Sequence, residues 1–269
     1  ASSNFGMYYN GVDHSSGVAL NTNVWDYYAI VKNTTTMTFY RNGTKIISIA
    51  ETGRVSDQGT VLDIGRYYQG STYFNGSLDE VMIFNTALNS SQISDIYNNQ
   101  SRRFKSLGTQ TIKQENISTG NYQVNLLTSS NAFLSTNISG RVGYWDITKG
   151  YNNTDFITPS GLVAYYHLDS NNGTVNYTSD SIGTNNGQCI EFAAGSTDCN
   201  FTSGVYNNGI SFDGLGYITT TTSLSPYFNN NTNITFGAWI YPISTASSPV
   251  IVSKATGGTA RANYRLGLT

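Results

Sequence analysis

The sequence predicts an all-β protein, on the evidence of its composition, its short apolar runs and its turn signals. The 269 residues are 13% aromatic, with 20 Tyr, but only 11% charged. Such a composition excludes a largely disordered chain, because disorder goes with few aromatic residues and high net charge. Short runs rich in Val, Ile, Tyr, Phe and Thr, bounded by Gly or Asn, are typical of a β-sandwich or barrel. They include YYAIVKN, MTFYRNG, TKIISIA and VMIF.

Two local motifs predict individual elements. Asn42-Gly43 separates two strand-like runs and tolerates the positive φ of a type I′ turn, so we expect a hairpin there. A short helix of about two turns is expected within 87–101. Asn89 can cap its first turn while Gln92 reaches back, as in a capping box. Its apolar face consists of Ile93, Ile96 and Tyr97.

Charge and hydropathy exclude two classes of partner. The 14 basic and 16 acidic residues give a formal net charge of −2. This balance does not suit neutralisation of a phosphate backbone, so we expect no nucleic-acid binding. No stretch approaches the roughly 20 apolar residues that span a bilayer, so we expect no membrane insertion by this segment.

The two cysteines indicate an oxidising compartment. Cys189 and Cys199 are ten residues apart, which is not the spacing of a C-x-x-C redox pair. Two thiols are also too few for a structural zinc site. We expect a disulfide that closes a surface loop, and with it an extracellular location.

Glycosylation motifs support the same location. With 31 Asn and 64 Ser plus Thr, random placement gives about 7 N-x-S/T sequons (31 × 64/269), but the chain has 13. The excess favours a glycosylated exterior. The candidate residues are Asn33, Asn42, Asn75, Asn89, Asn99, Asn116, Asn137, Asn152, Asn172, Asn176, Asn200, Asn230 and Asn233.

Longer patterns carry a family resemblance. The stretch 24–97, with NVWDYYAIV, FYRNG, VLDIG, FNGSLDEVMIFNTAL and ISDIYN, resembles the C-terminal half of a laminin-G-like (LamG) domain. From Gly161 onward, GLVAYYHLD, DSIGTNNG, FTSGVYNNGISFDGLGYI and ITFGAWIYP resemble the N-terminal half of such a domain. The resemblance implies a concanavalin A-like jelly-roll sandwich, cut into two half-domains or permuted.

This resemblance divides the chain into three parts. We expect the C-terminal half of one LamG-like domain in 1–103, a small β spacer of three or four strands in 104–160, and the N-terminal half of a second domain in 161–269. Half a jelly roll leaves strand edges unpaired. The halves could be completed within a tandem array, by strand exchange between identical units, or by closure of one chain on itself. We favour the first two arrangements, which make identical repeat units head-to-tail partners.

Glucanases share this fold, so catalysis needs a separate test. The chain lacks the E-x-D-x-x-E pattern of those enzymes. Asp79 and Glu80 are adjacent, so regular strand alternation would place them on opposite faces. We expect a structural role, with Asp79 accepting backbone hydrogen bonds. His14, in a polar turn, and His167, a packed or rim histidine, have no G-x-S-x-G elbow beside them. We therefore expect no enzyme activity.

Two ligand sites remain as hypotheses. Relatives with this resemblance often bind Ca²⁺, which implies Asp79, Asp180 and Asp213 as carboxylates, although turn capping competes and no cofactor is required. Tyr67, Tyr68 and Tyr73 are candidates for a glycan platform. We expect Trp25 and Trp239 to be buried.

The function predicted from the sequence is structural. It is an extracellular repeat unit of a filament or long surface array, in which half-domains of successive units complete one jelly roll. The alternative is a carbohydrate-binding, lectin-like adhesion module with surface glycans as partners.

Overall fold

The structure, a computed structural model, describes most of the chain. The described residues are 4–9, 11–53, 61–67, 72–102, 133–138, 141–146, 159–169, 177–190, 199–220, 233–245, 249–255 and 262–268. They fall into two compact units, Ala1–Gln100 together with Pro159–Thr269, and Ser101–Thr158. Among the described residues, no helix has the length and apolarity required to cross a membrane.

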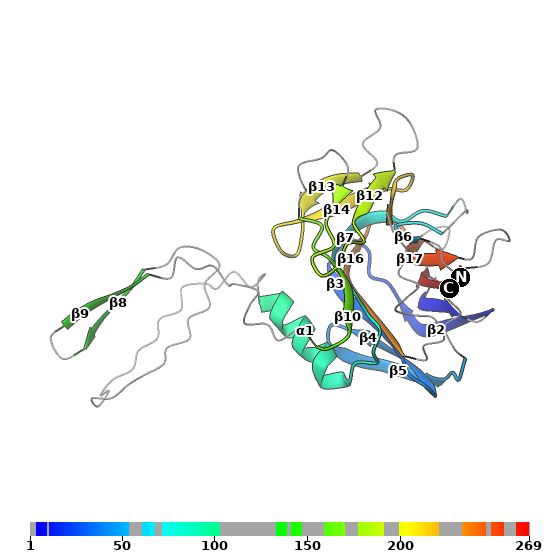
Figure 1. The fold of residues 1–269 in the computed structure, drawn as a ribbon, viewed down its shortest axis with the longest axis horizontal. Coiled ribbons are helices and arrows are strands. Elements are labelled where there is room, and N and C mark those ends of the chain that lie inside the picture. Colours follow the sequence, from blue (N-terminus) through cyan, green and yellow to red (C-terminus); the bar gives the residue numbers. More distant parts are fainter. Residues whose placement is uncertain are drawn as a thin grey trace. The chain divides into compact units, whose positions relative to one another are not determined.

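The first unit is a sandwich of two antiparallel sheets, as expected for a jelly roll (Figure 1). Sheet A consists, in spatial order, of β11 (Tyr177–Thr178), β12 (Gly187–Ile190), β15 (Tyr217–Thr220), β6 (Leu62–Ile64), β17 (Val250–Ala255), β18 (Ala262–Leu268), β1 (Asn4–Tyr9) and β2 (Val12–Ala19). Sheet B consists of β13 (Cys199–Ser203), β14 (Asn208–Asp213), β7 (Asn75–Phe84), β16 (Ile234–Pro242), β3 (Asp26–Lys32), β4 (Thr36–Arg41) and β5 (Thr44–Ala50). A further strand, β10 (Leu162–Tyr166), pairs with β7.

The core lies between the sheets and follows the period of two along each strand. In β1, Phe5, Met7 and Tyr9 are buried in the core. In the neighbouring β18, Tyr264 and Leu266 join them. The residues between these positions therefore point to the outer face of sheet A, which matters for the site described below.

The two half-domains complete each other within one chain. Strand β1 pairs with β18 from Phe5↔Leu268 to Tyr9↔Tyr264, so the first and last strands lie side by side (Figure 1). In sheet B, β16 lies between β3 and β7. Closure of one chain on itself, which was not favoured from the sequence, is the arrangement in this structure. The strands of 161–269 pair with those of 1–103 and complete the sandwich that 1–103 begins.

The predicted hairpin is confirmed. Asn42 and Gly43 connect β4 to β5 with φ values of 50° and 75°, both in the left-handed region that a type I′ turn requires. The side chain of Asn42 adds a second anchor, because its Oδ1 accepts a hydrogen bond from Tyr27 N at 2.9 Å.

The predicted helix, α1 (Ser90–Arg102), is present but longer than two turns. Its capping box is confirmed, since Asn89 N donates to Gln92 Oε1 and Gln92 N donates to Asn89 Oδ1, both at 2.9 Å. Ile93 and Ile96 are fully buried. The extra length comes from tertiary contacts, because Gln100 near the far end is hydrogen-bonded to sheet B.

In the second unit the structure describes one hairpin. Strands β8 (Phe133–Ile138) and β9 (Arg141–Asp146) pair antiparallel from Phe133↔Asp146 to Ile138↔Arg141. The other strands predicted for 104–160 lie outside the described residues.

Candidate functional site

A β-bulge in β7 places Asp79 and Glu80 on the same face of sheet B. Asp79 pairs with Trp239 and Met82 pairs with Gly237, so two residues of β7 stand opposite the single residue between these partners. Glu80 has a φ of 52°, in the left-handed region. The extra residue interrupts the alternation. The expectation that the two carboxylates point to opposite faces is therefore wrong, because it assumed a regular strand.

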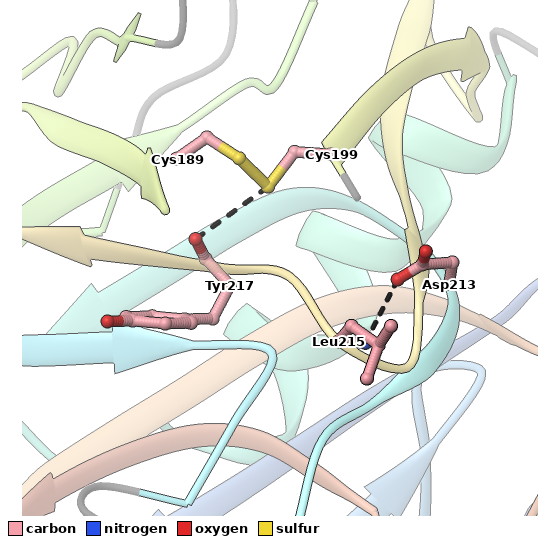
Figure 2. Close-up of a disulfide and its surroundings, with 5 residues drawn as sticks. All are labelled: Cys189, Cys199, Asp213, Leu215 and Tyr217. Atoms are coloured by element: carbon pink, nitrogen blue, oxygen red, sulfur yellow. Dashed lines mark hydrogen bonds between the residues drawn. A yellow bond between two sulfur atoms is a disulfide. The ribbon is translucent and has the colours of Figure 1, made fainter. Parts of the chain in front are cut away.

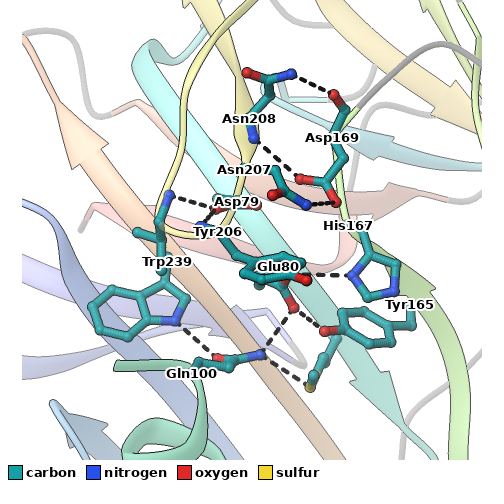
Figure 3. A network of polar contacts seen from close by, with 12 residues as sticks. Asp79, Glu80, Gln100, Tyr165, His167, Asp169, Tyr206, Asn207, Asn208 and Trp239 are labelled. Carbon is teal, nitrogen blue, oxygen red and sulfur yellow. Dashed lines mark hydrogen bonds and ion pairs between the residues drawn. The ribbon is translucent and has the colours of Figure 1, made fainter. Parts of the chain in front are cut away.

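Asp79 fixes a turn, as the sequence analysis expected. It is fully buried, and its Oδ2 accepts hydrogen bonds from Val205 N at 2.6 Å and Tyr206 N at 2.9 Å. Asp169 supports the same turn by accepting a hydrogen bond from Asn208 N at 3.1 Å (Figure 3). Burial, with the charge of Glu80 adding to it, raises the pKa of Asp79 to about 9.

Glu80 ties helix α1 to the outer face of sheet B. Its carboxylate accepts hydrogen bonds from Tyr165 Oη and from Gln100 Nε2 at 3.2 Å, and it lies 3.2 Å from His167 Nδ1 (Figure 3). Gln100 Oε1 in turn accepts a hydrogen bond from Trp239 Nε1 at 2.8 Å. Glu80 is fully buried, so this arrangement is built to join α1, β7 and β10 rather than to meet a substrate.

The two histidines occupy different places. His167 lies at the rim of the Glu80 network, directly after β10, with 24% of its side chain exposed. His14 lies in strand β2 rather than in a turn, and its Nε2 is 3.0 Å from Glu51 Oε2. Glu51 follows β5, so this pair links an edge of sheet A to an edge of sheet B.

The three carboxylates implied for Ca²⁺ do not form one site. The described residues contain no group of three or more His, Cys, Asp or Glu side chains placed to hold a metal ion. Asp180 accepts hydrogen bonds from Tyr165 N at 3.0 Å and Ile182 N at 3.1 Å, and Asp213 accepts one from Leu215 N at 2.9 Å. These contacts suit turn capping. Ca²⁺ binding stays a prediction, which a thermal melt with EDTA tests.

The predicted disulfide is present (Figure 2). Cys189 lies in β12 of sheet A and Cys199 begins β13 of sheet B, with their Cα atoms 6.3 Å apart. The bond therefore links the two sheets at one edge of the sandwich. The His14–Glu51 pair links them at the opposite edge.

The sequons differ in how the fold uses their amides. Asn42 uses both ends of its amide, because its Nδ2 also donates to Asp26 Oδ1 at 2.6 Å. Asn33 Oδ1 accepts hydrogen bonds from Thr35 N and Thr36 N. The side chain of Asn137 and the whole of five other candidates lie outside the described residues. Those five are Asn116, Asn152, Asn172, Asn176 and Asn230.

A cluster of tyrosine and arginine side chains lies on the outer face of sheet A. Tyr217 is the first residue of β15, and because the next residue, Ile218, points into the core, Tyr217 points outward. The guanidinium carbon of Arg66 lies 3.4 Å from the ring centroid of Tyr217. Tyr73 lies 6.4 Å from Tyr217, centroid to centroid. The Arg265 guanidinium carbon lies 5.4 Å from the ring centroids of both Tyr8 and Tyr67. We call these six residues the platform: Tyr8, Arg66, Tyr67, Tyr73, Tyr217 and Arg265.

The platform is accessible and its charges are paired. All six side chains are partly exposed. Arg66 Nε donates to Asp63 Oδ2 at 2.9 Å, and Arg265 Nη2 donates to Asp13 Oδ1 at 3.0 Å. Burial raises the pKa of Asp63, and the charge of Arg66 opposes that shift. The tyrosine rings can stack on a ligand, the two arginines can donate hydrogen bonds to it, and the exposed carboxylate of Asp13 can accept them, whereas Asp63 is fully buried.

Part of this platform was predicted from the sequence. Tyr67 and Tyr73 belong to it, whereas Tyr68 lies outside the described residues. Tyr8, Arg66, Tyr217 and Arg265 were missed, although alternation with apolar neighbours signals that Tyr8 and Arg265 point outward. Their proximity to Tyr67 depends on the order of strands in sheet A, which no local pattern contains.

The two tryptophans do not share one environment. Trp239 is buried, as predicted, and packs 5.6 Å from the ring of Tyr97 in α1. Trp25 is only partly buried, because it lies just before the first ladder residue of β3. Its ring lies 5.5 Å from that of Tyr241. The expectation that Trp25 is buried is therefore wrong.

Comparison with protein-family models gives a match to part of the chain. Residues 2–94, about a third of the chain, match the model Laminin_G_3, described as the concanavalin A-like lectin/glucanases superfamily. Neither curated proteins nor solved structures gave a match to the chain.

Proposed function

We propose that the protein is a carbohydrate-binding, lectin-like adhesion module, starting from the match of residues 2–94 to the model of the concanavalin A-like lectin/glucanases superfamily. The observation that carries the proposal is the platform on the outer face of sheet A. Its four tyrosines and two arginines are partly exposed, come from five separate segments and approach one another within ring-contact distances.

The chemistry of the platform suits a sugar. A sugar ring presents apolar C–H groups on its faces and hydroxyl groups around its rim. Tyrosine rings offer apolar surface to the faces, and their hydroxyl groups exchange hydrogen bonds with the rim. The arginines add donors and Asp13, whose side chain is 54% exposed, adds an acceptor.

Binding rather than hydrolysis is the activity that the carboxylates support. LamG-like domains are generally non-catalytic binding modules. Asp79 and Glu80 share a face, but both are fully buried beneath the contacts of α1, β10 and the 205–208 turn. A glycosidase needs its carboxylates on either side of a bound sugar. Neither of these two reaches solvent.

An extracellular location fits this role. The Cys189–Cys199 disulfide links the two sheets and persists only where thiols are not kept reduced. The excess of sequons is consistent with a glycosylated surface protein.

A glycan array tests the proposal. We expect the wild-type protein to bind a restricted set of glycans and Tyr217→Ala to lose at least about tenfold in affinity for them. The matched control is Tyr206→Ala, a partly exposed tyrosine on the other side of the sandwich, which keeps binding. An array with no signal above background from the folded wild-type protein overturns the proposal.

A role as a structural repeat unit is the second candidate. The observation that favours it is the division of the chain into two compact units, because tandem arrays alternate domains with spacer segments. Strand exchange is not needed, because one chain completes its own sandwich. The test is the intact mass of the deglycosylated, reduced polypeptide from its native source. A mass several times 29.3 kDa supports a tandem array, and a mass near 29.3 kDa argues against one.

A further inference from the structure

We propose that the platform selects a neutral, extended glycan that lies across the strands of sheet A, and that Asp13 enforces this selectivity by cancelling the charge of Arg265. This inference rests on the proposed function and specifies the class of ligand. Three features carry it: a row of outward-facing residues, two aromatic–arginine subsites, and paired charges.

The first feature is a single row of outward-facing residues across six strands. Strand pairing joins Thr219 to Asp63, Asp63 to Ser253, Ser253 to Arg265, Arg265 to Tyr8, and Tyr8 to Asp13. The adjacent row is core, with Ile218, Ile64, Val252, Leu266 and Met7. A ligand that follows the outer row therefore runs perpendicular to the strands.

The second feature is a division of the platform into two subsites along this row. One subsite consists of Tyr73, Tyr217 and Arg66, and the other of Tyr67, Arg265 and Tyr8. From β15 to β1 there are four steps between neighbouring strands, or about 19 Å at the usual strand spacing. This span is too long for one sugar ring, so the row suits an oligosaccharide.

Arg66 and Tyr67, which connect the two subsites, are held in place by residues of sheet A beneath them. Ser253 and Asp63, in the middle of the row, are fully buried. Ser253 Oγ donates to the backbone oxygen of Arg66 at 2.8 Å, and Asp63 holds the Arg66 guanidinium. Arg66 and Tyr67 are therefore held above the middle of the sheet, where they connect the two subsites.

The third feature decides the charge of the ligand. Each arginine of the platform is paired with one carboxylate, Arg66 with Asp63 and Arg265 with Asp13, so the four charges sum to zero. An anionic glycan would have to displace a carboxylate or remain next to it, and like charges brought together are a common basis for rejection. A neutral glycan keeps both pairs and exchanges hydrogen bonds with the arginine donors and with the exposed carboxylate of Asp13.

Asp13 provides a direct test, because it neutralises the only platform arginine whose carboxylate partner is exposed. We expect the wild-type protein to bind neutral oligosaccharides on an array, with affinity that changes less than about twofold between low and high NaCl, since no net charge is screened. Asp13→Asn frees Arg265, and we expect it to gain at least about tenfold in affinity for uronate- or sulfate-bearing oligosaccharides. That gained binding should weaken at high salt.

The matched control is Asp95→Asn, which removes one exposed carboxylate from helix α1 on the other side of the sandwich. Both variants change the net charge equally, so a gain confined to Asp13→Asn assigns the effect to the platform. Preference of the wild-type protein for anionic glycans, with salt-sensitive affinity, overturns the inference and leaves the proposed function intact. Equal behaviour of the two variants overturns the role of Asp13. No binding to any glycan overturns the proposed function as well.

Discussion

The two outer faces of the sandwich use the same types of residue for different purposes. On sheet B, Glu80 accepts hydrogen bonds from Tyr165 and from Gln100 of helix α1, and Gln100 in turn accepts one from Trp239. On sheet A, two arginines and their carboxylates gather tyrosines with no helix among the described residues above them. Burial separates the two sets, since Glu80 is fully buried while the platform is partly exposed.

This difference predicts which property each face affects, stability or ligand binding. A buried carboxylate with several hydrogen-bond donors is costly to disturb, because the donors lose their partner away from water. The Arg265–Asp13 pair, whose carboxylate is exposed, gains little from its attraction in water. Substitutions on sheet B should therefore change stability, and substitutions on the platform should change binding.

The largest effect is expected from Asp79→Ala. The change leaves the backbone N–H groups of Val205 and Tyr206 without their acceptor in a buried turn. Each such loss costs about 1–3 kcal/mol, so we expect about 4 kcal/mol lower free energy of unfolding in chemical denaturation. The matched carboxylate on the other face, Asp13→Ala, should cost less than about 1 kcal/mol. Equal losses from the two variants would remove the distinction between the faces.

We also expect Asp79, in sheet B, to make the stability of the protein depend on pH. The pKa of Asp79 is raised from 3.8 to about 9 in the folded protein, so the folded state holds this proton more tightly than the unfolded state does. The corresponding stabilisation is complete below about pH 4 and is lost as the pH rises through about 9. Asp79→Asn keeps an oxygen acceptor for the turn but does not titrate. We expect a flatter profile in denaturation experiments at pH 5, 7 and 9, and an unchanged slope would contradict the assignment.

Local features were predicted from the sequence because their partners are close in the chain. The Asn42-Gly43 turn, the Asn89–Gln92 capping box and the Cys189–Cys199 disulfide each join residues no more than ten positions apart. Turn, cap and disulfide geometries depend mainly on residue type and spacing, so a short pattern is sufficient.

Long-range features were missed for a physical reason. The bulge at Glu80 arises from the pairing of β7 with β16, more than 150 residues later in the chain, and it brings Asp79 and Glu80 to one face. The approach of Tyr8 to Tyr67 across Arg265 requires β1, β6 and β18 to be placed in one sheet. Composition and spacing do not encode such pairings.

A smaller effect is expected at the helix that covers sheet B. Asn89→Ala removes the N-cap of α1, which typically costs about 1 kcal/mol. Asn98→Ala, an exposed position within the same helix, is the control and should be neutral or slightly stabilising because Ala has the higher helix propensity. Thermal melts of the two variants compare cap with helix interior, and a loss in both would indicate that the cap is not the cause.

The smallest change in stability is expected from Arg265→Ala, which acts on the platform. Its ion pair with Asp13 is exposed on the carboxylate side, and such pairs contribute about 0–1 kcal/mol. The free energy of unfolding should therefore change by less than about 1 kcal/mol. Glycan affinity should nevertheless fall by at least about tenfold, because Arg265 is the contact shared by Tyr8 and Tyr67. Denaturation and binding measured on one preparation separate the two effects. A large loss of stability with unchanged affinity would mean that the outer face of sheet A, like that of sheet B, serves the fold.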